Sequence, residues 1–117
     1  MQESIAFQKA IAFALRIVRL YKYLTEQKRE FVISKQILVT GAYIAKHINA
    51  ALHARARQGF SDHMFKALEN SLDTQLWLLL LNKGEFIDDN MYASLNTDCV
   101  EMIKLTSKIS KTSHQDE

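Results

Sequence analysis

The sequence predicts an all-α protein that forms one antiparallel, up-down-up-down four-helix bundle. Apolar residues recur at spacings of three and four along four segments, as expected for amphipathic helices. The 117 residues include no proline and only three glycines, fewer turn-forming residues than a β-rich domain needs. Hydrophobic residues make up 48% of the chain, which is enough to fill a core, and the length suits a single domain over residues 1–117.

The first helix is expected over residues 3–24, with Thr25 capping the helix that follows. Its main apolar stripe is predicted to be Phe7, Ile11, Ala14, Val18 and Tyr21, widened by Phe13, Ile17, Leu20 and Leu24. The second helix is expected to run without interruption over residues 26–56, a length of about 45 Å. Gly41 falls on its core stripe, at a cost of about 1 kcal/mol relative to alanine, so we expect another helix to approach closely there.

A break is predicted at Gln58 and Gly59, followed by a third helix over residues 60–82. Gly84 is expected to end this helix in a left-handed conformation. The predicted core stripe is Met64, Leu68, Ser71, Gln75 and Leu78, with Phe65, Leu72, Leu76 and Leu79 beside it.

Asp88 or Asp89 is expected to cap the fourth helix, because a carboxylate there accepts backbone N–H groups and complements the helix dipole. Its predicted stripe is Met91, Leu95, Cys99, Met102, Thr106 and Ile109. The tail from about residue 111 is polar and expected to fray. Cys99, the only cysteine, is expected to be a buried, unreactive thiol.

Composition argues against several classes of function. A single cysteine excludes an intrachain disulfide or a cysteine-cluster metal site. No glutamate is followed three residues later by histidine, the pattern of di-iron bundles, so no metal or other cofactor is expected. The longest apolar run, residues 76–81, is too short to span a bilayer. With no signal-peptide pattern, we expect a cytoplasmic protein.

Several short motifs follow one another in a characteristic order. They are Ile17-Val18-Arg19-Leu20-Tyr21-Lys22-Tyr23-Leu24, Glu30-Phe31-Val32, Gln36-Ile37-Leu38, Phe60 and Trp77-Leu78. In their order and spacing the chain resembles the bacterial four-helix-bundle proteins encoded by intervening sequences within 23S ribosomal RNA genes, over about residues 7–109. The resemblance implies a ring-like homopentamer. A related retroelement accessory protein has a similar pentameric bundle that binds nucleic acid through basic surfaces, an analogy at the level of the fold.

The chain departs from the family pattern at several polar positions. The family's middle motif resembles S-I-G-A-N-I-A-E-A, and the corresponding stretch here is residues 43–51. His47 replaces the asparagine and Ala50 replaces the acidic residue. In the third helix, Asn70 and Asp73 stand where the family has glutamates.

Four basic residues are candidates for contacting nucleic acid: Lys46, His53, Arg55 and Arg57. Lys46, His53 and Arg57 are spaced by seven and four, which places them on one face of the predicted second helix. Such a stripe suits phosphates, and repetition around a ring would multiply its field. The alternative is a solvated face with basic residues near a helix C-terminus. The net charge of +2 does not decide between them.

Two classes of function follow. The leading one is a non-enzymatic homo-oligomer that binds or scaffolds RNA or DNA and has no catalytic residues. The alternative is a HEPN-like ribonuclease, because the spacing of Arg57 and His63 fits the arginine–histidine pair of those helical enzymes.

The segment around Trp77 is apolar on almost every side. Only one face of this helix is needed for the core, so the other is expected to meet a second subunit. We predict that Trp77, Leu80 and Leu81 contribute to this interface. The alternative is a core widened by helix ends and loops.

Overall fold

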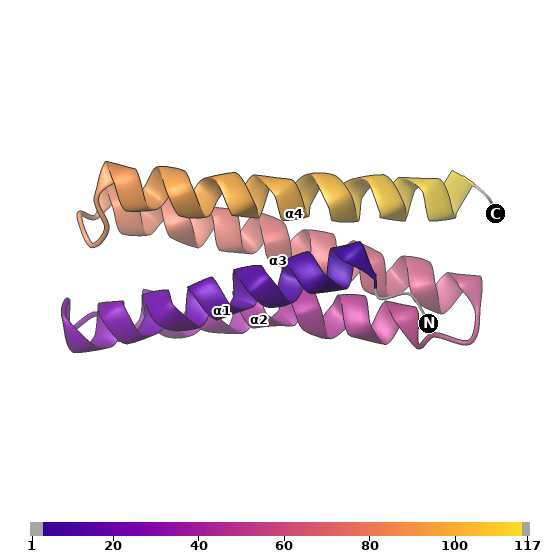
Figure 1. Ribbon diagram of the computed structural model, residues 1–117, viewed down its shortest axis with the longest axis horizontal. Coiled ribbons are helices and arrows are strands. Elements are labelled where there is room, and N and C mark those ends of the chain that lie inside the picture. The colour runs from indigo at the N-terminus through magenta and orange to yellow at the C-terminus, as the bar shows by residue number, and fades with distance from the viewer. Residues whose placement is uncertain (1–3, 116–117) are drawn as a thin grey trace.

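The computed structural model describes residues 4–115 and contains four helices in that range, with no strand. They are α1 (Ile5–Glu26), α2 (Ile33–Leu52), α3 (Arg57–Lys83) and α4 (Asp89–Gln115) (Figure 1). The body is elongated, 46 Å by 23 Å by 23 Å. The predicted all-α fold is confirmed. None of these helices is long and apolar enough to cross a membrane.

The helices pack in sequence order around one core. α2 lies against α1 and α3, and α4 lies against α3 and, less extensively, α1. α1 and α3 lie on one diagonal of the bundle, and α2 and α4 lie on the other. The backbones of the two helices on a diagonal do not approach each other closely. The α2–α3 turn lies at the same end as the start of α1 and the end of α4, and both longer loops lie at the opposite end (Figure 1).

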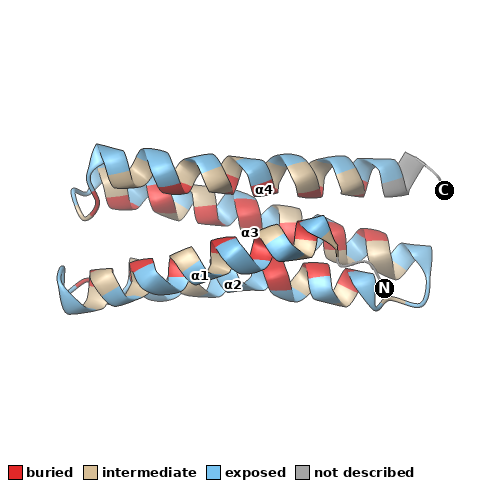
Figure 2. Cartoon of the chain, viewed as in Figure 1, coloured by how far each residue is buried: buried red, intermediate tan, exposed pale blue. Residues whose placement is uncertain are grey.

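The core uses a different stripe of α1 from the predicted one. Ile11 and Val18 are 40% exposed. The buried residues are those predicted only to widen the stripe, together with two alanines: Ala6, Ala10, Phe13, Ile17, Leu20 and Leu24. Both sets have helical spacing, so periodicity did not distinguish the inner stripe from the outer one. Figure 2 shows the buried residues gathered along the inner sides of the helices.

Close approach at Gly41 is confirmed. A Cβ atom added to this buried glycine would lie 2.9 Å from Cγ2 of Ile17 on α1. No methyl group fits at that distance, so the missing side chain lets α1 and α2 come together.

The predicted continuous helix over residues 26–56 is wrong at both ends. Thr25 does not cap α2; it belongs to α1, and its hydroxyl donates to the carbonyl of Tyr21 at 2.9 Å. The chain then leaves the helix, and Arg29 takes a left-handed conformation with φ of 56°. α2 begins only at Ile33.

Glu30 explains where α2 begins. Its side chain accepts hydrogen bonds from the backbone N–H groups of Val32 (3.1 Å), Ile33 (2.8 Å) and Ser34 (2.6 Å). These N–H groups have no carbonyl partner within the helix, so a buried carboxylate satisfies them and places negative charge at the positive end of the dipole. Burial alone would raise the pKa of Glu30, but the three backbone donors hold it below its usual value.

The predicted position of the break between the second and third helices, at Gln58 and Gly59, is also wrong. α2 ends at Leu52, and α3 begins at Arg57 with both residues in its first turn. Ala56 precedes α3 in an extended conformation, and its methyl side chain cannot accept a hydrogen bond from the first N–H groups of α3. α3 is therefore longer than predicted and α2 is much shorter.

At the other end of α3, Gly84 has a φ of −80° and is not the left-handed residue; Glu85 is, with φ of 67°. The predicted Asp88 cap is confirmed, since its carboxylate accepts the Met91 N–H at 2.8 Å. α4 continues to Gln115, so the tail predicted to fray is helical to that residue. Asp116 and Glu117 lie outside the described residues.

Candidate nucleic-acid interface

Charge is divided unequally between the two halves of the bundle. When each helix is divided at its midpoint, the half that contains the α2–α3 turn has eight lysines and arginines and two carboxylates among the described residues. They are Lys9, Lys46, Arg55, Arg57, Lys66, Lys104, Lys108 and Lys111, with Asp62 and Glu69. The remaining half, the two-loop half, has seven basic residues and eight carboxylates. Positive charge is thus concentrated in the α2–α3 half; Glu3, Asp116 and Glu117 lie outside the described residues.

The four predicted phosphate-contacting residues all lie in the α2–α3 half and are exposed. The prediction that they share one helical face is wrong, because α2 ends before His53. Lys46 lies on α2, His53 follows its last residue, Arg55 lies in the turn and Arg57 begins α3. They are grouped by the turn between two helices instead of by one stripe.

Two of these residues have local contacts that the sequence did not predict. Lys46 Nζ lies 4.3 Å from the ring centroid of Tyr43, a cation–π distance. His53 Nδ1 lies 2.9 Å from the Asn49 carbonyl oxygen. Tyr43 is 39% exposed beside Lys46, so an aromatic ring accompanies this basic residue at the surface.

A histidine pair joins α2 to α3 in the same half. His47 Nδ1 and His63 Nδ1 lie 3.1 Å apart. The ring planes are inclined by 23° and their centroids are 5.4 Å apart. Sequence reasoning treated His47 only as a departure from the family motif and missed its partner, because sixteen residues and a turn of unpredicted length separate them.

The surroundings of the pair are positive. Partial burial lowers the pKa of His47, and His63, Lys46 and Lys66 lower it further through charge repulsion. Tyr43 makes an edge contact with the His47 ring at a centroid distance of 6.1 Å. The carboxylate of Asp62, next to His63, instead accepts a hydrogen bond from the Gln58 amide at 2.8 Å.

The residues of the ribonuclease alternative lie on one helix. Arg57 begins α3 and His63 follows within the same helix. The Nδ1 of His63 meets His47, so the structure gives His63 a histidine partner that the arginine–histidine hypothesis did not include.

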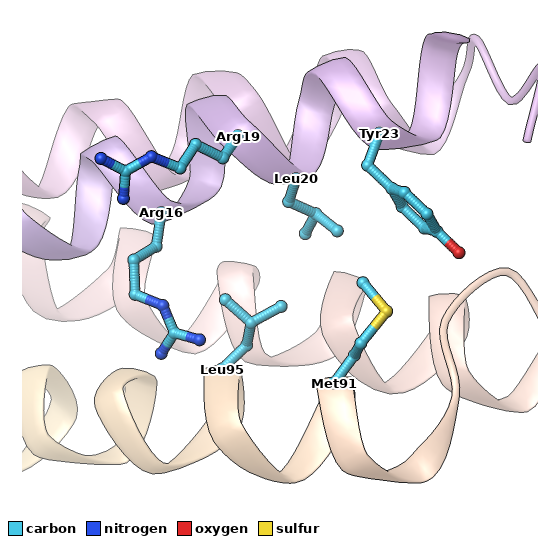
Figure 3. Close-up of a pocket in the computed structure, with 6 residues that line it drawn as sticks. All are labelled: Arg16, Arg19, Leu20, Tyr23, Met91 and Leu95. Carbon is cyan, nitrogen blue, oxygen red and sulfur yellow. The ribbon is translucent and has the colours of Figure 1, made fainter. Parts of the chain in front are cut away.

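A second candidate site is a groove between α1 and α4 with a volume of about 280 Å³ (Figure 3). Leu20, Met91 and Leu95 supply apolar walls, and Arg16, Arg19 and Tyr23 complete the lining. Arg16 is engaged by Asp98 at 2.7 Å and by the Ser94 hydroxyl at 2.8 Å. Both charges of this pair are partly exposed, so the ion pair contributes about 0–1 kcal/mol.

The three predicted interface residues have different environments. Leu81 is fully buried in the core of its own chain, so it does not lie on the predicted surface. Leu80 is 41% exposed. Trp77 is half-buried, and its buried Nε1 has no hydrogen-bond acceptor among the described residues.

Two apolar stripes remain exposed on the diagonal helices. On α3 the stripe is Phe65, Leu72, Leu76 and Leu79, residues predicted to lie beside the core. On α1 it is Ile11, Leu15 and Val18. Because α1 and α3 are diagonal and both stripes lie opposite the core, they face away from each other.

No site for metal or thiol chemistry accompanies these surfaces. Across residues 4–112, whose side chains the structure describes, no group of three or more histidine, cysteine or acidic side chains is placed to hold a metal ion. Cys99 is fully buried, and burial raises the pKa of its thiol to about 12, as expected for an unreactive cysteine.

Comparison with known proteins agrees with this architecture. No curated protein matches the chain. A solved structure of a protein of unknown function from the S23 ribosomal protein family of Bacteroides thetaiotaomicron is similar, with 40% sequence identity and a TM-score of 0.90. The similarity covers 92% of this chain and 96% of that one. The model of the 23S rRNA-intervening sequence protein family matches residues 2–108, and the chain belongs to that family.

Proposed function

We propose that this protein is a non-enzymatic homo-oligomer that binds the phosphate backbone of RNA or DNA through its α2–α3 half. The observation that supports this proposal is the excess of basic over acidic side chains in that half, eight against two among the described residues. Lysine and arginine that neutralise phosphates release counterions, which is the main source of sequence-independent affinity. In the two-loop half the positive and negative charges nearly cancel. The electrostatic field of the protein therefore orients the basic half toward a polyanion.

Self-association is the second part of the proposal. The α1 and α3 stripes expose large apolar side chains on opposite faces, and a soluble protein gains free energy by covering them. If the α1 stripe of one subunit packs on the α3 stripe of the next, the contact is heterologous, and such contacts form a ring when the rotation between neighbouring subunits closes. Family resemblance makes a pentamer the expected ring, and it would gather five basic halves.

The binding proposal is tested with Lys46→Gln/Arg57→Gln. Fluorescence anisotropy with unrelated RNA and DNA oligonucleotides, over a range of salt concentrations, should show weaker binding to all of them. The salt dependence should flatten by about one unit per lost contact in each engaged subunit. The matched control is Lys22→Gln/Lys35→Gln, which removes two exposed charges from the two-loop half. Equal binding by both folded variants would contradict the proposal.

An RNA cleavage assay with the same purified protein distinguishes the ribonuclease alternative from the binding proposal. Incubation with structured RNA should leave the RNA intact at all salt concentrations. Cleavage that disappears in His63→Ala, with Arg57→Gln also inactive, would favour the ribonuclease and reject a purely binding role.

The assembly proposal is tested by Val18→Glu on the α1 stripe and Leu76→Glu on the α3 stripe. Each variant should be monomeric by light scattering, because a buried unpaired carboxylate costs several kcal/mol. A mixture of the two should form only a heterodimer, since each retains the stripe that the other has lost. Gln36→Glu, an exposed change away from both stripes, should assemble like the wild type. Full assembly of either stripe variant alone would contradict a heterologous ring.

A further inference from the structure

The pairing of His47 with His63 is more specific than two histidines on neighbouring helices. Their Nδ1 atoms are 3.1 Å apart, and the ring centroids are 5.4 Å apart. The difference, about 2.3 Å, equals one ring radius on each side. The two nitrogens therefore lie on the line between the ring centres and point directly at each other.

This in-line geometry fits one shared proton. A neutral imidazole has one N–H donor and one acceptor nitrogen, so one ring donates Nδ1–H to the Nδ1 of the other. A metal ion on the same line would need about 4 Å between the nitrogens, given zinc–nitrogen bonds of about 2.0–2.1 Å. The observed 3.1 Å separation leaves no room for it.

The neutral pair can take up two protons in turn. The first adds to the free Nε2 of the donating ring and leaves the Nδ1–H···Nδ1 hydrogen bond in place, and the second adds to the accepting Nδ1 and breaks that bond. Both Nδ1 atoms then carry hydrogen, and two N–H dipoles on two positive rings oppose each other across the seam. This repulsion is relieved when the rings move apart and an anion accepts a hydrogen bond from each Nδ1–H group. Lys46 on α2 and Lys66 on α3 act on His47 with positive charge, and the nearby Asp62 carboxylate accepts from Gln58.

We propose that His47 and His63, with Lys46 and Lys66 beside them, form a proton-gated binding site for a phosphate group. While the pair shares one proton, its own hydrogen bond closes the site. After the second proton binds, two N–H donors and two ammonium groups face one anion from two helices. Phosphate fits this set because it offers several acceptor oxygens and negative charge, one charge on a backbone diester and up to two on free phosphate near pH 7.

The phosphate has two possible sources, free inorganic phosphate and a nucleic-acid backbone. Only the nucleic-acid source rests on the proposed function. In that case the site makes part of the affinity for RNA or DNA depend on pH. The binding of free phosphate to the histidine pair can be tested without nucleic acid.

Histidine-selective NMR of the full chain tests the site directly. The spectrum is followed from about pH 8 to about pH 5, with and without inorganic phosphate. The pair should titrate in two linked steps that belong to both rings. Phosphate should move the lower step upward, by about one unit when its concentration is about ten times the dissociation constant.

The control variants separate the pair from ordinary histidines. His47→Asn, which restores the residue of the family motif, should abolish both the linkage between the two rings and the response of the site to phosphate. His53 also lies in the basic half, but its ring contacts the Asn49 carbonyl in place of a second histidine, so it shows how far phosphate moves a histidine outside the pair. His63→Gln should have the reciprocal effect on His47. If the two rings titrate independently in the wild type, or phosphate moves His53 as much as the pair, the proposal is overturned.

Oligonucleotide binding identifies the source of the phosphate. If the backbone occupies the site, the affinity ratio of wild type to His47→Asn should rise as pH falls below about 6.5, the ordinary histidine value. A phosphate response with a constant ratio assigns the site to free phosphate. Absence of oligonucleotide binding at every pH would reject the proposed function and leave the phosphate response as the test of the site.

Discussion

The two ends of this bundle begin their helices in different ways. At the two-loop end, α2 starts on the Glu30 carboxylate, which accepts three backbone N–H groups, and α4 starts on the Asp88 carboxylate. At the α2–α3 end, α1 starts on the neutral Ser4 hydroxyl, which accepts the Phe7 N–H, and α3 starts after Ala56 with no side-chain cap. One end uses its acidic residues to hold backbone in place, whereas the other has few acidic residues and many basic ones.

This contrast separates structural charge from surface charge. Glu30 is 8% exposed and bonded at short distances, so its role is fully explained within the chain. Lys46 and Arg55 are exposed beside a turn, where Lys46 lies over the Tyr43 ring and neither side chain caps a helix end. Charge that the fold does not require is the better guide to a binding surface, and here it lies at one end.

The largest expected effect comes from removing the Glu30 cap. Glu30→Ala leaves three backbone donors without their acceptor, and we expect a loss of about 3 kcal/mol in the free energy of unfolding. Urea unfolding followed by circular dichroism measures it. Glu26→Ala, on the exposed end of α1, should change stability by no more than about 0.5 kcal/mol. Equal effects of the two substitutions would contradict the structural role of Glu30.

The same cap predicts how stability depends on acid. Because the folded-state pKa of Glu30 lies below its unfolded value, its contribution is complete above the unfolded value of 4.5. It is lost as pH falls from there through the folded value. In Glu30→Ala this part of the acid-induced loss should be missing.

A smaller effect is expected from adding a cap where the α2–α3 end lacks one. Ala56 has φ of −126° and ψ of 154°, the extended conformation of an N-cap residue. Ala56→Ser should therefore stabilise the protein by about 1 kcal/mol, as measured by urea unfolding. It should leave oligonucleotide affinity unchanged, since it adds no charge. A loss of stability would show that the turn is held by other contacts.

The smallest expected effect is the pH dependence contributed by His47. Its folded-state pKa lies below the ordinary value of 6.5, so the unfolded chain takes the proton first as pH falls. Stability is complete above that value and declines below it until the folded imidazole is also protonated. In phosphate-free buffer, thermal unfolding of wild type and His47→Asn should diverge in this window. Identical pH profiles would contradict the shift.

The sequence predicted the number and type of helices better than their boundaries. Four periodic segments were enough to identify four helices. The α1–α2 boundary was missed because Glu30 caps across a loop that contains no proline or glycine, only a left-handed Arg29. At the end of α3, the general preference for glycine in the left-handed conformation led to the wrong prediction of Gly84, because Glu85 adopts that conformation.

The candidate site was predicted as a region but not as an arrangement. Lys46, His53, Arg55 and Arg57 were singled out, but α2 ends before three of them, so a helical stripe was the wrong geometry. The His47–His63 pair depends on the register between α2 and α3, which only packing determines. The outer stripe of α1 was mistaken for core because a helix with two apolar faces has no single amphipathic direction.

The placement of the chain's first and last described residues has a practical consequence. α1 begins and α4 ends in the same half of the bundle, beside the α2–α3 turn (Figure 1). An affinity tag or fluorescent fusion joined before Ser4 or after Gln115 therefore leaves from the basic half, where an acidic tag would compete with a polyanion and a His-tag would add titrating imidazoles. A label in the opposite loop, around Lys28, avoids that interference, and binding measurements are best made with it.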